Sequence, residues 1–224
     1  RVVSALDELG LRDETAVMFT SDHGDTCGSR GLYDKDAFMF EELVRVPLIV
    51  RAPRTSNMEQ ERPNGERNSF SCGALVTNMD LAATALDLAG LDPSHCCDAR
   101  SLVPLLQGRR QGWRDEVMAE FSGLRFPCSL RMLRWGRYKY VFNPAGGDEL
   151  YDLEADPLEL TNRIDDPAMG AALKQCRRRL RDHLAASGDR LALASMRLAG
   201  EWSPEVWHSD AGGRDEDPDG EGRH

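Results

Sequence analysis

The strongest constraint on the fold is a short apolar run that ends in a cluster of polar residues. Residues 16–20 read AVMFT, and SDHGD follows at residues 21–25. A continuous apolar run of this length predicts a strand covered on both faces, as in a sheet flanked by helices. In open α/β sheets, ligands gather beyond the carboxyl ends of the strands. The pattern therefore predicts an α/β fold with a candidate site at residues 21–25.

Neighbouring segments fit the same fold. Residues 2–9 have apolar side chains at helical spacing, and Gly10 can end that helix. Residues 46–50, VPLIV, predict a second buried strand with Pro47 at its start. A further helix is predicted from Thr77, which forms a capping-box pattern with Asp80. Helices and short strands thus alternate along this part of the chain.

The pattern changes from Glu116 onward. Four short strand-like runs, EVMAEF, SLRMLRW, YKYVFN and ELYDL, are separated by turn residues, and WGRY predicts a tight hairpin. A basic helix is predicted over residues 169–186. This half reads as a small antiparallel sheet with one covering helix. We therefore divide the chain into an α/β part (1–113), an α+β subdomain (114–190) and a polar tail (191–224) predicted to be disordered.

The charge balance excludes some classes of partner. The chain has 28 basic and 38 acidic residues, a net charge of -10, which argues against nucleic acid. No run approaches the roughly 20 apolar residues of a membrane-spanning helix. Its six cysteines form no C-x-x-C pair, so we expect free thiols.

The residues of the polar cluster support two interpretations. Asp22 offers a hard anionic oxygen and His23 a nitrogen, and both are ordinary metal ligands. Gly24 would let the backbone turn sharply so that the two side chains converge. Asp and Gly also form turns, so a purely structural loop is the alternative. Two residues cannot complete a calcium site, which needs about six to eight ligands.

Several motifs resemble the type I sulfatases of the alkaline-phosphatase superfamily. They are TSDHGD, GLYDK, FMFEELVRVPLIVRAP, MDLAATALDLAGL, ARSLVPLLQG, GRYKYVFNP and ELYDLEADPLELTN, in the family order. The similarity runs from the first residue to about residue 162. It implies that residues 1–113 are the C-terminal part of the sulfatase catalytic domain, an open sheet with flanking helices, followed by the family's small C-terminal subdomain.

The resemblance implies roles for individual residues. Asp22 and His23 would bind a divalent metal ion, most often Ca²⁺ with Mn²⁺ as the alternative. Lys35, which ends GLYDK, would contact a sulfate oxygen; without the resemblance it reads as a solvated surface lysine. Arg30 stands where other members often have histidine, and its role stays open because arginine cannot act as a general acid. We expect Asp25 to stabilise the loop.

The family's nucleophile is a formylglycine made from cysteine or serine in a C/S-x-P-S-R motif. Cys27 begins CGSR, which lacks the proline, is one residue short and follows the metal-binding pair instead of preceding it. We therefore assign no catalytic residue here and expect the formylglycine upstream of this chain. The chain is expected to be the C-terminal portion of a sulfatase, inactive in isolation, whose residues 1–113 are not independently stable.

Three functional interpretations follow from the resemblance. The first is a sulfuric ester hydrolase that acts on a sulfated small molecule or glycan. The second is a phosphonate monoester hydrolase or phosphodiesterase of the same superfamily, and the third is a catalytically silent fragment or interaction module. Cytoplasmic, periplasmic and secreted locations, and the oligomeric state, are left open by the sequence.

Overall fold

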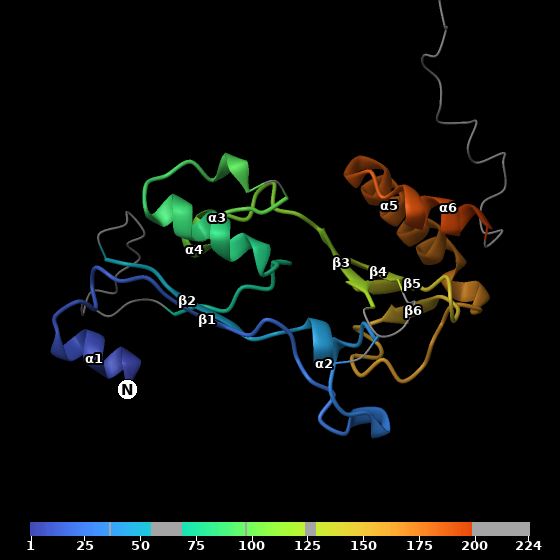
Figure 1. Cartoon of the computed structure of the whole chain (residues 1–224), viewed down its shortest axis with the longest axis horizontal. Helices are drawn as coiled ribbons and strands as arrows, with labels where there is room; N and C mark the ends of the chain where they lie inside the picture. Colours follow the sequence, from blue (N-terminus) through green and yellow to red (C-terminus); the bar gives the residue numbers. More distant parts are fainter. Residues whose placement is uncertain (36, 55–68, 97, 124–128, 199–224) are drawn as a thin grey trace, which may run out of the picture.

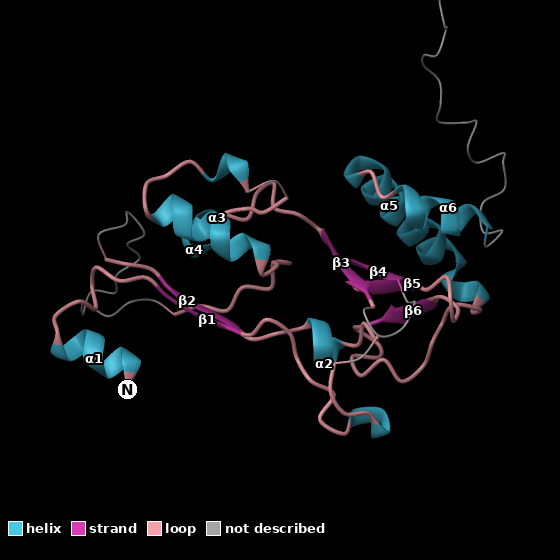
Figure 2. Ribbon diagram, in the orientation of Figure 1, coloured by secondary structure: helices cyan, strands magenta, loops and turns pink. Residues whose placement is uncertain are grey.

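The computed structural model describes residues 1–35, 37–54, 69–96, 98–123 and 129–198 (Figure 1). It is a mixed α/β structure with two antiparallel sheets (Figure 2). Its helices are α1 (Val2–Glu8), α2 (Glu41–Val44), α3 (Met79–Leu88), α4 (Val103–Leu106), α5 (Gly170–Ser187) and α6 (Arg190–Leu198), with 3₁₀ turns η1 (Ser29–Gly31), η2 (Pro93–His95) and η3 (Pro167–Met169). Its strands are β1 (Val17–Thr20), β2 (Leu48–Arg51), β3 (Glu116–Ser122), β4 (Ser129–Trp135), β5 (Tyr138–Phe142) and β6 (Glu149–Asp152).

Strands β1 and β2 form an antiparallel ribbon in which Phe19 lies opposite Ile49. Their side chains are 58% and 64% exposed, so the prediction that these strands are buried on both faces is wrong. Within the described ranges no third strand pairs with the ribbon, and both side chains of this pair stay more than half exposed. An apolar run marks residues suited to burial, but burial also requires partners from other segments.

Helix α3 begins close to the predicted position, and its first turn is anchored by a buried carboxylate. Asp80 accepts a hydrogen bond from the backbone N of Thr77 at 2.8 Å, which is one half of the predicted capping box. The other half is not formed. Both carboxylate oxygens of Asp80 also bind the guanidinium of Arg114, at 2.7 and 3.0 Å, and one accepts from the backbone N of Arg100. The start of α3 is thereby fixed to the segment that leads into β3.

The second sheet has the strand order β3-β4-β5-β6, and all its pairs are antiparallel. Trp135 pairs with Tyr138 across the hairpin, as predicted, and Gly136 takes a positive φ of 52° at the turn. Helices α5 and α6 lie on one side of this sheet (Figure 1). The core between them is built from apolar residues of both layers: Leu133, Tyr140, Phe142, Leu150, Cys176, Leu180, Leu184 and Met196.

Helix α6 lies within the segment predicted to be a disordered tail from residue 191. That prediction is wrong for residues 191–198. Ala192 and Met196, four residues apart on one face of α6, are buried in the core. Asp189 caps the helix by accepting a hydrogen bond from the backbone N of Ala192 at 3.0 Å. The rest of the predicted tail, 199–224, is outside the described residues, and the domain boundary near residue 113 stays a prediction.

The other face of the second sheet packs against the segment around α2. Met39 joins Leu130, Met132 and Val141 in a second buried cluster, with Val44 packed against it. Residues near the predicted site are thus held against the C-terminal sheet. Among the described helices, none combines the length and apolar character needed to cross a membrane.

Candidate metal and sulfate site

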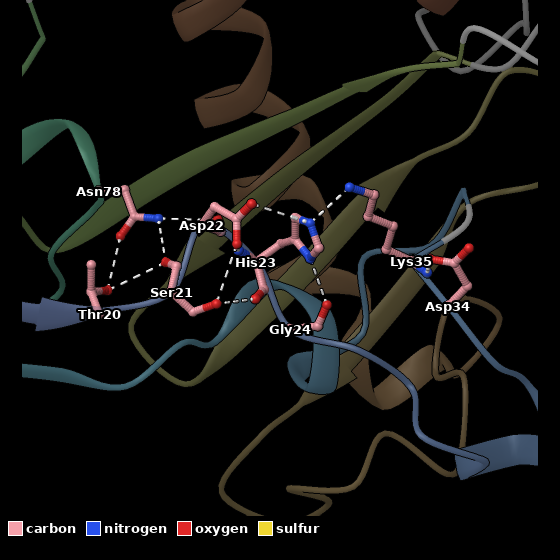
Figure 3. Close-up of polar contacts among 8 residues, drawn as sticks. All are labelled: Thr20, Ser21, Asp22, His23, Gly24, Asp34, Lys35 and Asn78. Atoms are coloured by element: carbon pink, nitrogen blue, oxygen red, sulfur yellow. Dashed lines mark hydrogen bonds and ion pairs between the residues drawn. The ribbon is translucent and has the colours of Figure 1, made fainter.

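The predicted site residues lie in the loop that follows β1 (Figure 3). The strand ends at Thr20, and Asp22 and His23 follow within three residues. The side chain of Asp22 is 83% exposed and that of His23 is 41% exposed. Strand β1 therefore delivers the carboxylate and the imidazole to the surface.

Hydrogen bonds keep the Asp22 carboxylate ionised and hold its direction. Its Oδ1 accepts from the backbone N of His23 at 3.0 Å and from the hydroxyl of Ser21 at 3.3 Å. The pKa of Asp22 is lowered, first by this backbone hydrogen bond and then by the electrostatic interaction with His23. The carboxylate presents Oδ2 on the side of the imidazole, 3.4 Å from Nε2 of His23.

The structure brings Lys35 to the same imidazole. Its Nζ lies 2.8 Å from Nε2 of His23, while Nδ1 lies 2.7 Å from the carbonyl oxygen of Gly24. Both contacts are satisfied together when the ring carries its hydrogen on Nδ1, which donates to Gly24, and Nε2 accepts from the ammonium. All three predicted site residues are therefore linked by direct contacts.

Gly24 is required by close packing, not by an unusual backbone angle as the sequence suggested. It is absent from the described residues with positive φ. A Cβ added at Gly24 would lie 1.8 Å from the carbonyl oxygen of Glu42 in α2. The backbone N of Gly24 donates to the carbonyl of Leu43 at 2.8 Å. Helix α2 therefore packs directly against the backbone of the site loop.

Asn78 is a site residue that the sequence analysis missed. Its side-chain amide donates to the carbonyls of Ser21 and Asp22 at 3.0 and 3.1 Å, and its oxygen faces the hydroxyl of Thr20 at 3.4 Å (Figure 3). It precedes the first residue of α3. Asparagine is common just before the first residue of a helix, so Asn78 is consistent with a helix start. Nothing in the local sequence indicates its contact with Asp22, which is 56 positions away.

Asp25 and Cys27 shape the loop beyond the site. The carboxylate of Asp25 accepts from the backbone N of Cys27 at 2.6 Å, which confirms the expected loop-stabilising role. Cys27 is exposed, and its pKa is raised because its thiol donates to that same carboxylate. A raised pKa keeps the sulfur as a weakly nucleophilic thiol, in agreement with its placement in a loop.

Arg30 is turned toward the C-terminal subdomain. Its guanidinium donates to the carbonyl of Glu159 at 2.9 Å and to that of Leu158, and it stacks 3.9 Å over the ring of Phe40. These contacts give the residue a structural role. It joins the loop after the site to the segment that follows β6.

Asn78 also lines a groove of about 570 Å³. Its walls come from the connection between α2 and β2, residues 72–78, β3 and β4. The lining is largely apolar but includes Arg45 and Arg134, which form no ion pair among the described residues. The size is typical of small-ligand sites.

Asp22 and His23 fit two places of a cation site. A carboxylate oxygen and an imidazole nitrogen are suitable donors, and the carboxylate is ionised. Over the described ranges, no group of three or more His, Cys, Asp or Glu residues converges on one point. Two ligands are too few for calcium. A complete site would need ligands from residues that the structure does not describe or that lie outside this chain.

Residues 28–186 match the family described as N-sulphoglucosamine sulphohydrolase, C-terminal. The choline-sulfatase of Rhizobium meliloti is 34% identical over 169 residues, which is 74% of this chain and 30% of that protein. The chain therefore spans about a third of the length of this relative.

Two solved structures extend the comparison. One is a complex with its substrate D-glucosamine-2-N,6-O-disulfate. It is 26% identical with a TM-score of 0.69, and the match covers 85% of this chain and 38% of the solved chain. The phosphonate monoester hydrolase of Agrobacterium radiobacter is 30% identical with a TM-score of 0.68. This match covers 83% of our chain and 38% of the hydrolase chain. The fold is thus shared with proteins that act on chemically related esters.

Proposed function

This chain belongs to the sulfatase family of the alkaline-phosphatase superfamily and carries its C-terminal region, and from this premise we propose that it supplies one side of a metal-dependent sulfuric ester hydrolase site. Asp22 and His23 are two ligands of a divalent cation, for which we favour Ca²⁺. Lys35 binds an oxygen of the sulfate. The observation that carries the proposal is the convergence of these three side chains at the tip of β1.

The charges of the three residues suit this division of roles. Asp22 stays ionised at neutral pH, which favours a bound cation. When bound, a divalent cation stabilises negative charge that develops on the oxygens of a sulfate ester. Lys35 brings an ammonium to within 2.8 Å of the imidazole, where it can bind an anionic oxygen beside the metal ligands.

The attacking group is not assigned to this chain. Cys27 is held as a thiol by Asp25 and is exposed in a loop, so it is a poor nucleophile. In the family the attack comes from a formylglycine, which we place outside residues 1–224. The isolated chain is then a binding surface without its nucleophile, and we expect it to be inactive.

A sulfated glycan or small sulfate ester is the substrate class that we favour. One solved structure of the same fold holds a doubly sulfated glucosamine. The groove beside Asn78, with an apolar lining and the cations Arg45 and Arg134, suits an organic group that carries a second anion. Hydrolysis of phosphonate monoesters is the second candidate, because a hydrolase of that class is equally similar in fold.

A chimera tests the proposal. Residues 1–198, which include α6, would replace the corresponding segment of the choline-sulfatase of Rhizobium meliloti, and hydrolysis of an aryl sulfate and of a phosphonate monoester would be measured. We expect the sulfate to be the faster substrate. Lys35→Met should lower kcat/KM for the sulfate about 100-fold, the order found for loss of one oxyanion contact. Arg12→Met, which removes an exposed cation paired with Asp7, is the matched control.

Each other outcome contradicts part of the proposal. Faster hydrolysis of the phosphonate would favour the second candidate. A folded chimera that hydrolyses neither ester would favour the catalytically silent interpretation. Equal rates for the parent chimera and Lys35→Met would remove Lys35 from the substrate site.

A further inference from the structure

Glu159 lies far from the site in the sequence but is linked to it through α2 and Arg30. It follows β6 in the C-terminal subdomain and is only 2% exposed. One carboxylate oxygen lies 2.7 Å from Nζ of the fully buried Lys139, and the other accepts from the backbone N of Glu41 at 2.7 Å. Lys139 also pairs with the Glu41 carboxylate at 3.1 Å. The first residue of α2 is therefore held on both its backbone and its side chain.

Helix α2 is in turn hydrogen-bonded to the site loop. The helix has only four residues, Glu41–Val44, so an anchor at its first residue fixes the whole element. Its carbonyl at Leu43 accepts from the backbone N of Gly24 at 2.8 Å. The Glu42 carboxylate accepts from the hydroxyl of Ser29 at 2.7 Å. Two points of the loop that follows the candidate metal ligands are thus bonded to α2.

A second connection runs through the backbone of Glu159. Its carbonyl accepts from Arg30 at 2.9 Å, which holds the loop between the metal ligands and Lys35. Glu159 takes a positive φ of 53°, a conformation that is costly for a residue with a Cβ. In that conformation its carboxylate reaches Lys139 and Glu41 while its carbonyl reaches Arg30. The positive φ of Glu159 therefore allows its side chain and its carbonyl to make all of these contacts at once.

We propose that Glu159 is a positioning residue, which sets the Asp22–His23 loop from the C-terminal subdomain through α2 and Arg30. The ion pair with Lys139 stabilises the carboxylate in a buried place, since an unpaired buried charge is costly. The contact that matters for the loop is the acceptor for the backbone N of Glu41. The functional meaning of this role rests on the proposed function, but the placement of the loop can be measured without metal or substrate.

Hydrogen exchange at the Gly24 amide tests the proposal in the full 224-residue chain. The matched variants are Lys139→Met/Glu159→Gln and Lys139→Met/Glu159→Leu. Neither leaves Lys139 or Glu159 as an unpaired buried charge, and only glutamine keeps an acceptor for Glu41. We expect Gly24 to exchange about tenfold faster in the leucine variant than in the glutamine variant, while amides of β5 exchange equally in both.

Two further variants separate this role from general stability. Glu116→Gln removes ion pairs with Arg179 and His183 on the α5 side of the same sheet. It should speed exchange at β5 at least as much as at Gly24. Lys139→Met/Glu159→Ala also removes the acceptor for Glu41 without leaving an unpaired Lys139, so it should speed exchange at Gly24 more than at β5, and it serves if the leucine variant does not fold.

Equal exchange at Gly24 in the leucine and glutamine variants, or changes at Gly24 that only follow those at β5, would overturn the proposal. The result is independent of the chimera experiment. Faster exchange at Gly24 in the leucine variant, together with a folded chimera that hydrolyses neither ester, would support positioning by Glu159 and reject the proposed function.

Discussion

The Nζ of Lys35 lies 2.8 Å from Nε2 of His23, so the residue proposed to bind sulfate already contacts a residue proposed to bind the metal. Nε2 is the nitrogen that faces the Asp22 carboxylate. A cation bound by both residues would therefore have to displace the ammonium from the imidazole. This contact adds a cost to cation binding by a site that has only two ligands from the described residues.

We therefore expect calcium to have little effect on the isolated chain. Ligands that bind only the folded state raise the melting temperature, by an amount that grows with the logarithm of the ratio of their concentration to Kd. With two ligands and a competing ammonium, millimolar Ca²⁺ should produce little or no shift in a thermal melt. A clear stabilisation that disappears in Asp22→Ala would show that the chain holds a complete site.

Gly24→Ala should destabilise the chain strongly. The new Cβ would lie 1.8 Å from the carbonyl oxygen of Glu42, so α2 would have to move. Overpacking of this kind typically costs about 1–3 kcal/mol, and contact with backbone favours the upper end. Gly73→Ala is the control, because nothing lies within 4 Å of its added Cβ. Urea unfolding compares the two, and similar stabilities would contradict the close approach of α2.

Asn78→Asp should loosen the backbone of the site loop. The substitution keeps the shape but replaces two N–H donors with an anionic oxygen that faces the carbonyls of Ser21 and Asp22. A loss of about 1–2 kcal/mol is expected from the unfolding free energy. Asn143→Asp is the matched control, because its Oδ1 accepts from Ala145 and Gly146 and an aspartate preserves both contacts. Equal effects at the two positions would argue against a specific role for the Asn78 amide.

The acid stability of the chain should depend on Asp152. Its pKa is lowered from 3.8, mainly by the hydrogen bonds from Arg137. Because the folded-state pKa lies below the unfolded one, the stabilisation is present above pH 3.8 and is lost as the pH falls through the folded value. Asp152→Asn should lower stability at neutral pH by about 1 kcal/mol, since Arg137 is partly exposed and screened by solvent.

Urea unfolding across the acid range checks this sign. The difference between the parent and Asp152→Asn should be constant near neutral pH and shrink below about pH 4. A difference that grew as the pH fell would contradict the lowered pKa.

The features that could be predicted from the sequence are those set by neighbouring residues. The second sheet follows from short apolar runs between turn residues, and its hairpin from Gly136. Features that depend on distant segments could not be predicted. Phe19 and Ile49 suit a buried sheet, but their burial depends on partners that no described segment supplies. The contact between Glu159 and Glu41 joins residues 118 positions apart.

The candidate site divides in the same way. Asp22 and His23 are adjacent in a recognisable motif, and the resemblance also pointed to Lys35. Asn78 and Gly24 act through backbone contacts with other elements, which sequence spacing does not encode. The role of Arg30 depends on contacts with the carbonyls of Leu158 and Glu159, which lie more than 120 positions away in the sequence.

Calcium affinity of the sulfatase chimera tests the central claim most directly. The claim is that Asp22 supplies one ligand of a cation site completed by residues outside this chain. Isothermal titration should show saturable Ca²⁺ binding by the parent chimera and at least about 100-fold weaker binding by its Asp22→Ala variant. The control is Asp92→Ala, which removes an exposed carboxylate elsewhere in the chain and should bind Ca²⁺ as the parent does. Equal calcium affinity in the parent and Asp22→Ala chimeras would contradict the account.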